Sequence, residues 1–284
     1  MKSLNCNGRL LVMDEPLVMG IINTTPDSFF AGSRVSQTDA LLFRAEEMIR
    51  DGAALLDIGG QSTRPNSQRV AMEEELARVL PAVEALHRRF PETPLSIDTY
   101  YARVARETVQ AGASIINDVT AGGIDPELIP TVAELQVPYV LMHIQGTLEN
   151  MQQNPVYQNV VTEVFDALNE KMAGLHQAGI NDIIIDPGFG FGKTIAHNFQ
   201  LLSGLRYFEQ LNKPLLVGLS RKGTVYKTLG VTAEEALNGT TVVNTISLLH
   251  GAHLLRVHDV KEAVQAIRLV QALRQSDNSR VQNI

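Results

Sequence analysis

The chain has 284 residues, with 31 acidic and 24 basic side chains and a formal net charge of −7. This length suits two ordinary domains or one large α/β barrel, and the charge balance argues against a basic face that binds nucleic acid. The single cysteine, Cys6, excludes an intramolecular disulfide and a multi-cysteine metal site. The N-terminus lacks the apolar stretch of a signal peptide, and no run of about 18 apolar residues occurs. The sequence therefore predicts a soluble cytoplasmic protein without membrane contact.

The first sixteen residues predict a short strand pair, and eight apolar runs follow with helical stretches between them. The runs are LVMGIIN ending at Asn23, ALLDIGG from Ala54, PLSIDT from Pro94, ASIINDV from Ala113, PYVLMHI from Pro138, DIIIDPG from Asp182, KPLLVGLSRK from Lys213 and AHLLRVHD from Ala252. Runs that are apolar throughout are typical of parallel strands covered on both faces. They predict one α/β domain over residues 1–274, a (β/α)₈ TIM barrel whose floor is closed by the N-terminal strand pair. Residues 275–284 predict a polar, disordered tail.

Glycines and charges mark the ends of the predicted helices. Glu73, Glu74 and Glu75 lie in the first turn of a helix that runs toward Phe90, where they suit the helix dipole. A glycine precedes a strand by a residue or two at four places, which are Gly52, Gly112, Gly179 and Gly251. This pattern predicts repeated helix-to-strand connections.

The segment from Ile183 to Thr194, IIIDPGFGFGKT, resembles a phosphate-binding P-loop at first sight. The first glycine of such a loop would fall on Pro187, which has no N–H to donate and a fixed φ. The spacing therefore disfavours a P-loop and leaves Asp186 as a carboxylate at a strand end, followed by a loop that faces a ligand.

Nearly every predicted strand ends in a polar residue, and barrel enzymes bind substrates at these ends. The residues are Asn23, Asp57, Asp98, Asn117, His143, Asp186, the pair Arg221 and Lys222, and the pair Arg256 and His258. Each has a structural alternative: the Asp and Asn residues could cap a following helix, His143 could be a satisfied structural histidine, and arginines such as Arg64 and Arg256 could form surface ion pairs. Their repetition at successive strands favours a shared site.

The strand-end residues divide by chemistry into two groups. Asp98, Asn117, Asp186 and Lys222 offer donors and acceptors that suit a flat heterocycle with an amide and ring nitrogens. Asn23, Arg64, Arg256 and His258 offer polar and cationic groups for phosphate oxygens. No zinc-ligand spacing or Ser–His–Asp order is present, whereas a Mg²⁺ ion shared with a diphosphate would leave little trace in the sequence.

Seven motifs resemble those of the dihydropteroate synthase family, and the resemblance runs from about Pro16 to Arg274. They are IINTTPDSFFAG from Ile21, DIGGQSTRP from Asp57, SIDTY from Ser96, INDV from Ile116, DPGFGFGKT from Asp186, SRKG from Ser220 and RVHDV from Arg256. The resemblance implies a TIM barrel, usually dimeric. It also implies a transferase of folate biosynthesis that joins 6-hydroxymethyl-7,8-dihydropterin diphosphate to 4-aminobenzoate and releases pyrophosphate, with Mg²⁺, by an SN1-like path.

The resemblance also assigns residues to each substrate. For the pterin it implies Asp98, Asn117, Asp186 and Lys222, with Val119 and Met142 as walls and Arg256 stacked on the ring. For the diphosphate it implies Asn23, Thr63, Arg64, Arg256 and His258, with Asn23 also a Mg²⁺ contact. For 4-aminobenzoate it implies Phe29, Thr63, Pro65, Phe191, Ser220 and Lys222. The groups expected to act in the reaction are Asp98, Lys222, Arg256, His258 and Arg64. Ordinary packing remains the alternative for Met142, Phe29 and Phe191.

Three positions depart from the family pattern. Gln61 stands where many members have glutamate, Asn66 where glycine is common, and Ala71 where a serine often caps the next helix. These departures concern loop behaviour and helix capping. Two rival functions remain: a pterin methyltransferase, which would lack a diphosphate site, and a non-catalytic pterin-binding protein, which would lack the cationic residues of the second group.

Overall fold

Eight parallel strands form a barrel in the computed structural model, which describes residues 2–24, 34–61 and 69–281. The strands are β3 (Leu17–Asn23), β4 (Leu55–Gly59), β5 (Leu95–Asp98), β6 (Ile115–Asp118), β7 (Tyr139–Met142), β8 (Ile183–Asp186), β9 (Leu216–Val217) and β10 (Leu254–Val257). Their order is β8-β7-β6-β5-β4-β3-β10-β9. A parallel bridge between Ile185 and Leu215 joins the two ends of this sheet, so the predicted (β/α)₈ barrel is confirmed.

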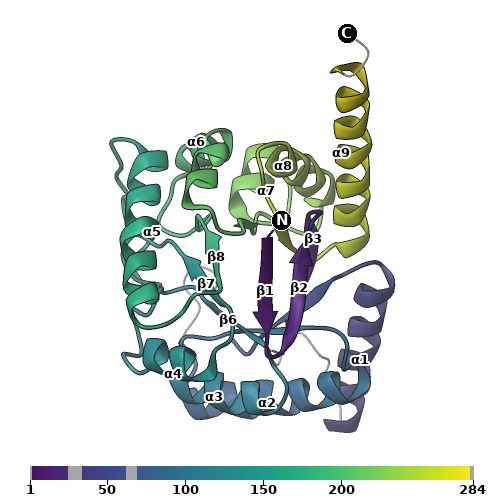
Figure 1. Cartoon of the computed structure of the whole chain (residues 1–284), viewed down its shortest axis with the longest axis vertical. Coiled ribbons are helices and arrows are strands. Elements are labelled where there is room, and N and C mark those ends of the chain that lie inside the picture. Colours follow the sequence, from purple (N-terminus) through teal and green to yellow (C-terminus); the bar gives the residue numbers. More distant parts are fainter. Residues whose placement is uncertain (1, 25–33, 62–68, 282–284) are drawn as a thin grey trace.

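Helices surround the strands (Figure 1). They are α1 (Arg34–Arg50), α2 (Met72–Arg89), α3 (Ala102–Gln110), α4 (Leu128–Leu135), α5 (Val160–Gln177), α6 (Ile195–Ser203), the 3₁₀ helix η1 (Leu205–Leu211), α7 (Gly223–Leu229), α8 (Leu237–Leu249) and α9 (Val260–Val281). None of those described is long and apolar enough to cross a bilayer. The four glycines before strands all have positive φ, between 91° and 117°, which side chains rarely tolerate.

The N-terminal strand pair covers one end of the barrel. Strands β1 (Lys2–Cys6) and β2 (Arg9–Met13) pair antiparallel, and they lie across the barrel in Figure 1. Their side chains Leu4, Cys6 and Met13 form a buried cluster with residues from the early part of the barrel strands. The prediction that this pair closes the barrel floor is therefore confirmed.

The same apolar cluster shows why polar side chains gather at the carboxyl ends of the barrel strands. Its floor layer includes Leu55, Ile115, Ile184 and Leu254, one from each of four strands. Side chains two residues apart on a strand point to the same face. The next inward positions toward the carboxyl ends are therefore those of Asp57, Asn117, Asp186 and Arg256. Each of these four strands therefore points an apolar side chain into the barrel near its start and a polar side chain into the barrel near its carboxyl end.

The C-terminal end differs from its prediction. Helix α9 continues to Val281 and projects beyond the barrel (Figure 1), so residues 275–281 are helical and not an irregular tail. The segment holds no glycine or proline to end the helix, and polar side chains are compatible with an exposed helix.

Candidate active site

Three of the predicted strand-end residues meet around a fourth, Asp57, inside the barrel. Arg256 donates from Nε to Asp57 Oδ2 at 2.6 Å and from Nη2 to Asp98 Oδ2 at 2.9 Å. Asn117 donates from Nδ2 to the same Asp57 oxygen at 3.1 Å. The Asp57 side chain is completely buried, and its other oxygen, Oδ1, has no hydrogen-bond partner among the described residues. We name Asp57, Asp98, Asn117 and Arg256 the central cluster.

The structural alternatives for these residues fail on geometry. The next helices after β4, β5 and β6 begin behind Ala71, Tyr101 and Glu127, so none of Asp57, Asp98 or Asn117 is an N-cap. Arg256 pairs with two buried carboxylates, which a surface ion pair would not do. The cluster is an interior arrangement of charge.

Burial controls the protonation of this interior. Removal from water raises the pKa of Asp98, and the Arg256 guanidinium opposes that shift. Burial likewise raises the pKa of Asp186, with Lys222 opposing. Removal from water lowers the pKa of Lys222 to about 8, while Asp186 acts to raise it. The site therefore holds cations and carboxylates that stabilise one another's charged forms.

Lys222 lies where the loop after β9 meets the loop after β8. Its Nζ donates to the Phe189 carbonyl at 2.6 Å and lies 4.8 Å from the centre of the Phe191 ring. Phe191 packs in a small buried cluster that includes Val119 and Met142. Asp186 is oriented by the Gly188 N–H, 2.8 Å from Oδ1. The residues assigned to the pterin walls and to one side of the aminobenzoate site are thus neighbours.

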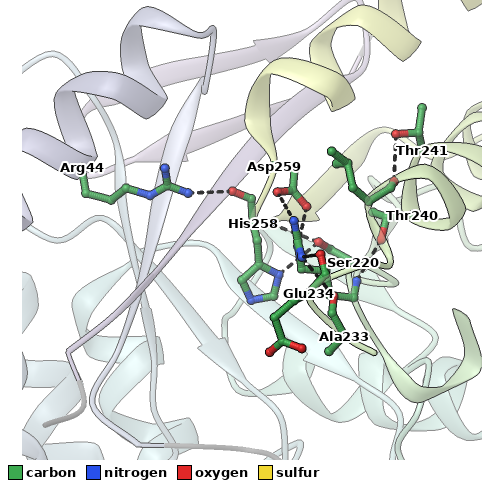
Figure 2. A network of polar contacts seen from close by, with 10 residues as sticks. Arg44, Ser220, Ala233, Glu234, Thr240, Thr241, His258 and Asp259 are labelled. Atoms are coloured by element: carbon green, nitrogen blue, oxygen red, sulfur yellow. Dashed lines mark hydrogen bonds and ion pairs between the residues drawn. The ribbon is translucent and has the colours of Figure 1, made fainter. Parts of the chain in front are cut away.

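Ser220 and His258 form a second contact between strand ends. Ser220 Oγ lies 3.0 Å from His258 Nδ1 and accepts from the His258 backbone N–H at 3.2 Å. Arg44 of α1 donates to the His258 carbonyl at 3.0 Å. Figure 2 shows the His258 ring beside Ser220, with Arg44 reaching its backbone. A residue assigned to the aminobenzoate and one assigned to the diphosphate are thereby held together.

Arg221 holds the loop that carries Ser220 and Lys222 in place through contacts with protein atoms. Its guanidinium donates to both oxygens of Asp259, at 2.8 and 2.9 Å, and to the carbonyls of Ala233 and Glu234. Its backbone N–H donates to Thr240 Oγ1, and its φ is +53°. Figure 2 labels its partners Ala233, Glu234, Thr240 and Asp259. The residue between Ser220 and Lys222 therefore ties their loop to the loop after β10.

Phe29, Thr63, Arg64 and Pro65 lie outside the described residues, as does Asn66. Asn23 ends β3, and its Oδ1 lies near Gly59 on the side of Asp98. Within the described ranges no group of three or more His, Cys, Asp or Glu side chains could hold a metal ion.

Sequence reasoning left Asp57 without a role, although it singled out the position. Its spacing could have indicated a role in the site. Asp57 lies two residues after Leu55, which points to the barrel floor, and Asn117 lies two residues after Ile115 in the same way. His143 has the structural role that the sequence offered as its alternative, because its ring accepts a hydrogen bond from buried Lys193.

Comparison with known proteins identifies the family of this chain. A family model described as pterin binding enzyme matches residues 19–258. The dihydropteroate synthase of Escherichia coli (strain K12) is 44% identical over 271 residues, which cover 95% of each chain. A structure of the Xanthomonas albilineans dihydropteroate synthase with 4-aminobenzoic acid has a TM-score of 0.89 and 43% identity, over 96% of this chain and 98% of that one. The same enzyme with 7,8-dihydropteroate has a TM-score of 0.86 and 41% identity, over equal shares. The chain therefore belongs to the pterin-binding enzyme family, among the dihydropteroate synthases.

Proposed function

We propose that this protein condenses 6-hydroxymethyl-7,8-dihydropterin diphosphate with 4-aminobenzoate to give 7,8-dihydropteroate and pyrophosphate, as a transferase of folate biosynthesis. The observation that carries the proposal is the central cluster at the strand ends of a barrel that matches dihydropteroate synthases over nearly its whole length. Binding of 4-aminobenzoic acid and 7,8-dihydropteroate by the Xanthomonas albilineans enzyme supports the choice of substrates.

The buried polar groups suit recognition of the pterin. Asp186 offers acceptors to ring N–H and amino groups, while Asn117 and Lys222 offer donors to ring nitrogens and the carbonyl oxygen. Val119 and Met142 are buried beside them and provide apolar walls. Because an unpaired polar group in such a site is costly, a ligand that lacks these groups would bind weakly.

Cationic and hydrogen-bonding groups near the carboxyl ends of the strands suit departure of the diphosphate. The C–O bond breaks, its electron pair stays on the diphosphate, and Arg256 and His258, with Arg64, stabilise the charge that develops there. The dihydropterin delocalises the positive charge left on carbon, and Asp98 stabilises it. The amine of 4-aminobenzoate then donates its electron pair to that carbon and releases a proton to solvent.

A Mg²⁺ ion fits this site through the diphosphate. The chain offers one suitable oxygen, Asn23 Oδ1, on an exposed side chain at the end of β3, which matches an ion that keeps water and phosphate oxygens as its other ligands. When bound, Mg²⁺ would neutralise charge on the diphosphate.

We also propose that the protein is a cytoplasmic homodimer. A buried lone thiol, Cys6, is compatible with a reducing compartment. Leu269 and Leu273 lie one turn apart on α9, and their side chains are 73% and 49% exposed. Val242 on the adjacent helix α8 is 51% exposed. An apolar strip of this kind suits a second copy of the chain.

One assay tests the proposed reaction. Purified protein is incubated with the pterin diphosphate, 4-aminobenzoate and Mg²⁺, and dihydropteroate and pyrophosphate are followed together. We expect both products in equal amounts, and folded protein that forms neither would overturn the proposal. Omission of Mg²⁺ should slow the reaction. Positional isotope exchange within the diphosphate, without 4-aminobenzoate, tests for ionisation before attack.

A further inference from the structure

Lys193 is a buried cation to which the proposed reaction gives no task. Its side chain is only 3% exposed, although it closes the glycine-rich loop 187–192 that follows β8. Lysine is almost never buried this deeply unless its ammonium group is satisfied. Its contacts therefore indicate what the ammonium is for.

All three of the Lys193 hydrogen bonds reach neutral acceptors at the same distance. Nζ lies 2.9 Å from His143 Nδ1, from the Gly188 carbonyl and from the Phe191 carbonyl. An ammonium has three N–H donors, so these contacts use its full capacity. Lys193 thus links His143, which directly follows β7, to two points of the loop after β8. We call these three hydrogen bonds the Lys193 bracket.

Both loop points are connected to substrate-binding groups. Phe191, whose carbonyl is held, presents its ring to the Lys222 ammonium at 4.8 Å. Gly188, whose carbonyl is held, donates its N–H to Asp186. The loop itself cannot easily take another path, since a Cβ atom on Gly188 or Gly192 would collide with backbone atoms of His143 or Gln145.

We propose that Lys193 is the positioning residue for the aminobenzoate side of the site, and that neutral His143 serves as its anchor. Lys193 touches neither substrate; it holds the Phe191 main chain so that the ring and Lys222 form one wall for 4-aminobenzoate. This inference rests on the proposed function, because it assigns a task within that site.

The protonation of the anchor agrees with this task. His143 must accept at Nδ1, so its proton lies on Nε2, and an imidazolium could not accept. Burial and the neighbouring Lys193 lower the pKa of His143 to about 3, so the ring is neutral at physiological pH. Burial also lowers the pKa of Lys193 to about 7, while Asp186 acts to raise it. Three acceptors at 2.9 Å favour the ammonium form, because only that form has three N–H donors.

The effect should fall on one substrate more than on the other. The Lys222 ammonium and the Gly188 N–H support the charge of Asp186 more than Lys193 does, and both remain in a Lys193 variant. The central cluster has no hydrogen bond to Lys193. Phe191 depends on Lys193 directly. Loss of the bracket should therefore weaken 4-aminobenzoate binding and leave pterin binding nearly intact.

The test is steady-state kinetics of Lys193→Met, with each substrate varied in turn while the other is saturating. We expect the KM for 4-aminobenzoate to rise by about tenfold or more, and the KM for the pterin diphosphate to change by less than about threefold. The matched control is Lys213→Met, which removes a lysine that donates to the Asn181 carbonyl at the barrel floor. It should alter neither KM.

A pair of variants at His143 keeps the test valid if Lys193→Met does not fold. His143→Asn can place Oδ1 where Nδ1 accepts, and should keep the KM for 4-aminobenzoate within about threefold of wild type. His143→Leu has no acceptor and should resemble Lys193→Met. Identical behaviour of the two His143 variants would overturn the inference. So would an equal rise of both KM values in Lys193→Met, or no rise in either.

Different results would overturn the proposed reaction and the proposed role of Lys193. No product from the folded wild-type protein would overturn the proposed function together with this inference. Wild-type turnover with an unchanged KM for 4-aminobenzoate in Lys193→Met would overturn the inference alone.

Discussion

Arg256 joins two buried carboxylates, so its loss should have two consequences. It contacts Asp57 and Asp98 at 2.6 and 2.9 Å. We expect Arg256→Ala to abolish most turnover and also to lower the free energy of unfolding by about 3–5 kcal/mol, because two buried carboxylates lose their cation. Urea unfolding and kcat on the same preparation check both parts.

A control separates this loss from that of an ordinary ion pair. Arg106 pairs with Glu134 at 2.6 Å on the surface, and Arg106→Ala should cost less than about 1 kcal/mol and leave kcat unchanged. Unfolding of Arg256→Ala at the wild-type urea concentration would contradict the bridging role of Arg256.

Glu75 should make stability depend on pH. It is fully buried in α2 and accepts from Gln61 Nε2 at 3.1 Å. Burial raises its pKa from 4.5 to about 7, and hydrogen bonding from Thr99 and the charges of Arg78 and Arg69 oppose the shift. The folded state therefore prefers protonated Glu75. The resulting stability is complete below pH 4.5 and is lost as pH rises through 7.

Glu75→Gln should remove this dependence. Its free energy of unfolding relative to wild type should increase by about 3 kcal/mol between pH 4 and pH 8. Titrating groups without electrostatic contact to Glu75 are common to both proteins and cancel in the difference, whereas Asp98, whose pKa the Glu75 charge raises, adds to it. Glu73→Gln, an exposed change in the same turn, is the control for net charge. A constant difference across the range would show that Glu75 titrates normally.

Helix α2 begins without a side-chain cap, and α5 begins with one. Ala71 has the extended conformation of an N-cap (φ −66°, ψ 149°) but accepts no hydrogen bond through its side chain. Asn159 accepts from the N–H groups of Val161 and Thr162. We expect Ala71→Ser to stabilise the fold by about 1 kcal/mol and Asn159→Ala to destabilise it by a similar amount. Thermal unfolding of both variants measures these opposite effects, and shifts of equal sign would contradict the capping argument.

The strands were predictable because each carries its own signal. Runs such as PLSIDT and ASIINDV are apolar on both faces, and each became a parallel strand. The end of α9 was not predictable in the same way, because polar composition is compatible with both an exposed helix and a tail. The 3₁₀ helix η1 also has no distinctive spacing.

The strand-end positions of the candidate site residues could be predicted from the sequence, whereas the pairing of their side chains could not. Strand-end position brought out Asp98, Asn117, Asp186, Lys222 and Arg256, because every parallel strand of a barrel ends on the same side. The partner of Arg256 lies 199 residues away, and the choice between Asp57 and other carboxylates depends on strand register. The Lys193 bracket likewise requires the three-dimensional path of two loops.

Leu269 and Leu273 of α9 and Val242 of α8 are among the large apolar side chains that stay exposed in the described part of the molecule, and we call these three the α8–α9 strip. Helix α9 also projects past the barrel (Figure 1).

If a second copy covers this strip, Leu269→Glu should place a charge in the interface and shift the protein from dimer to monomer in sedimentation equilibrium. Leu10→Glu makes the same change at a side chain that is 63% exposed on β2, and it should leave the mass unchanged. A wild-type monomer, or a dimer that Leu269→Glu does not weaken, would place the contact elsewhere or remove it. Because α9 follows directly on β10, which carries Arg256, monomeric Leu269→Glu would also reveal whether turnover depends on the second copy.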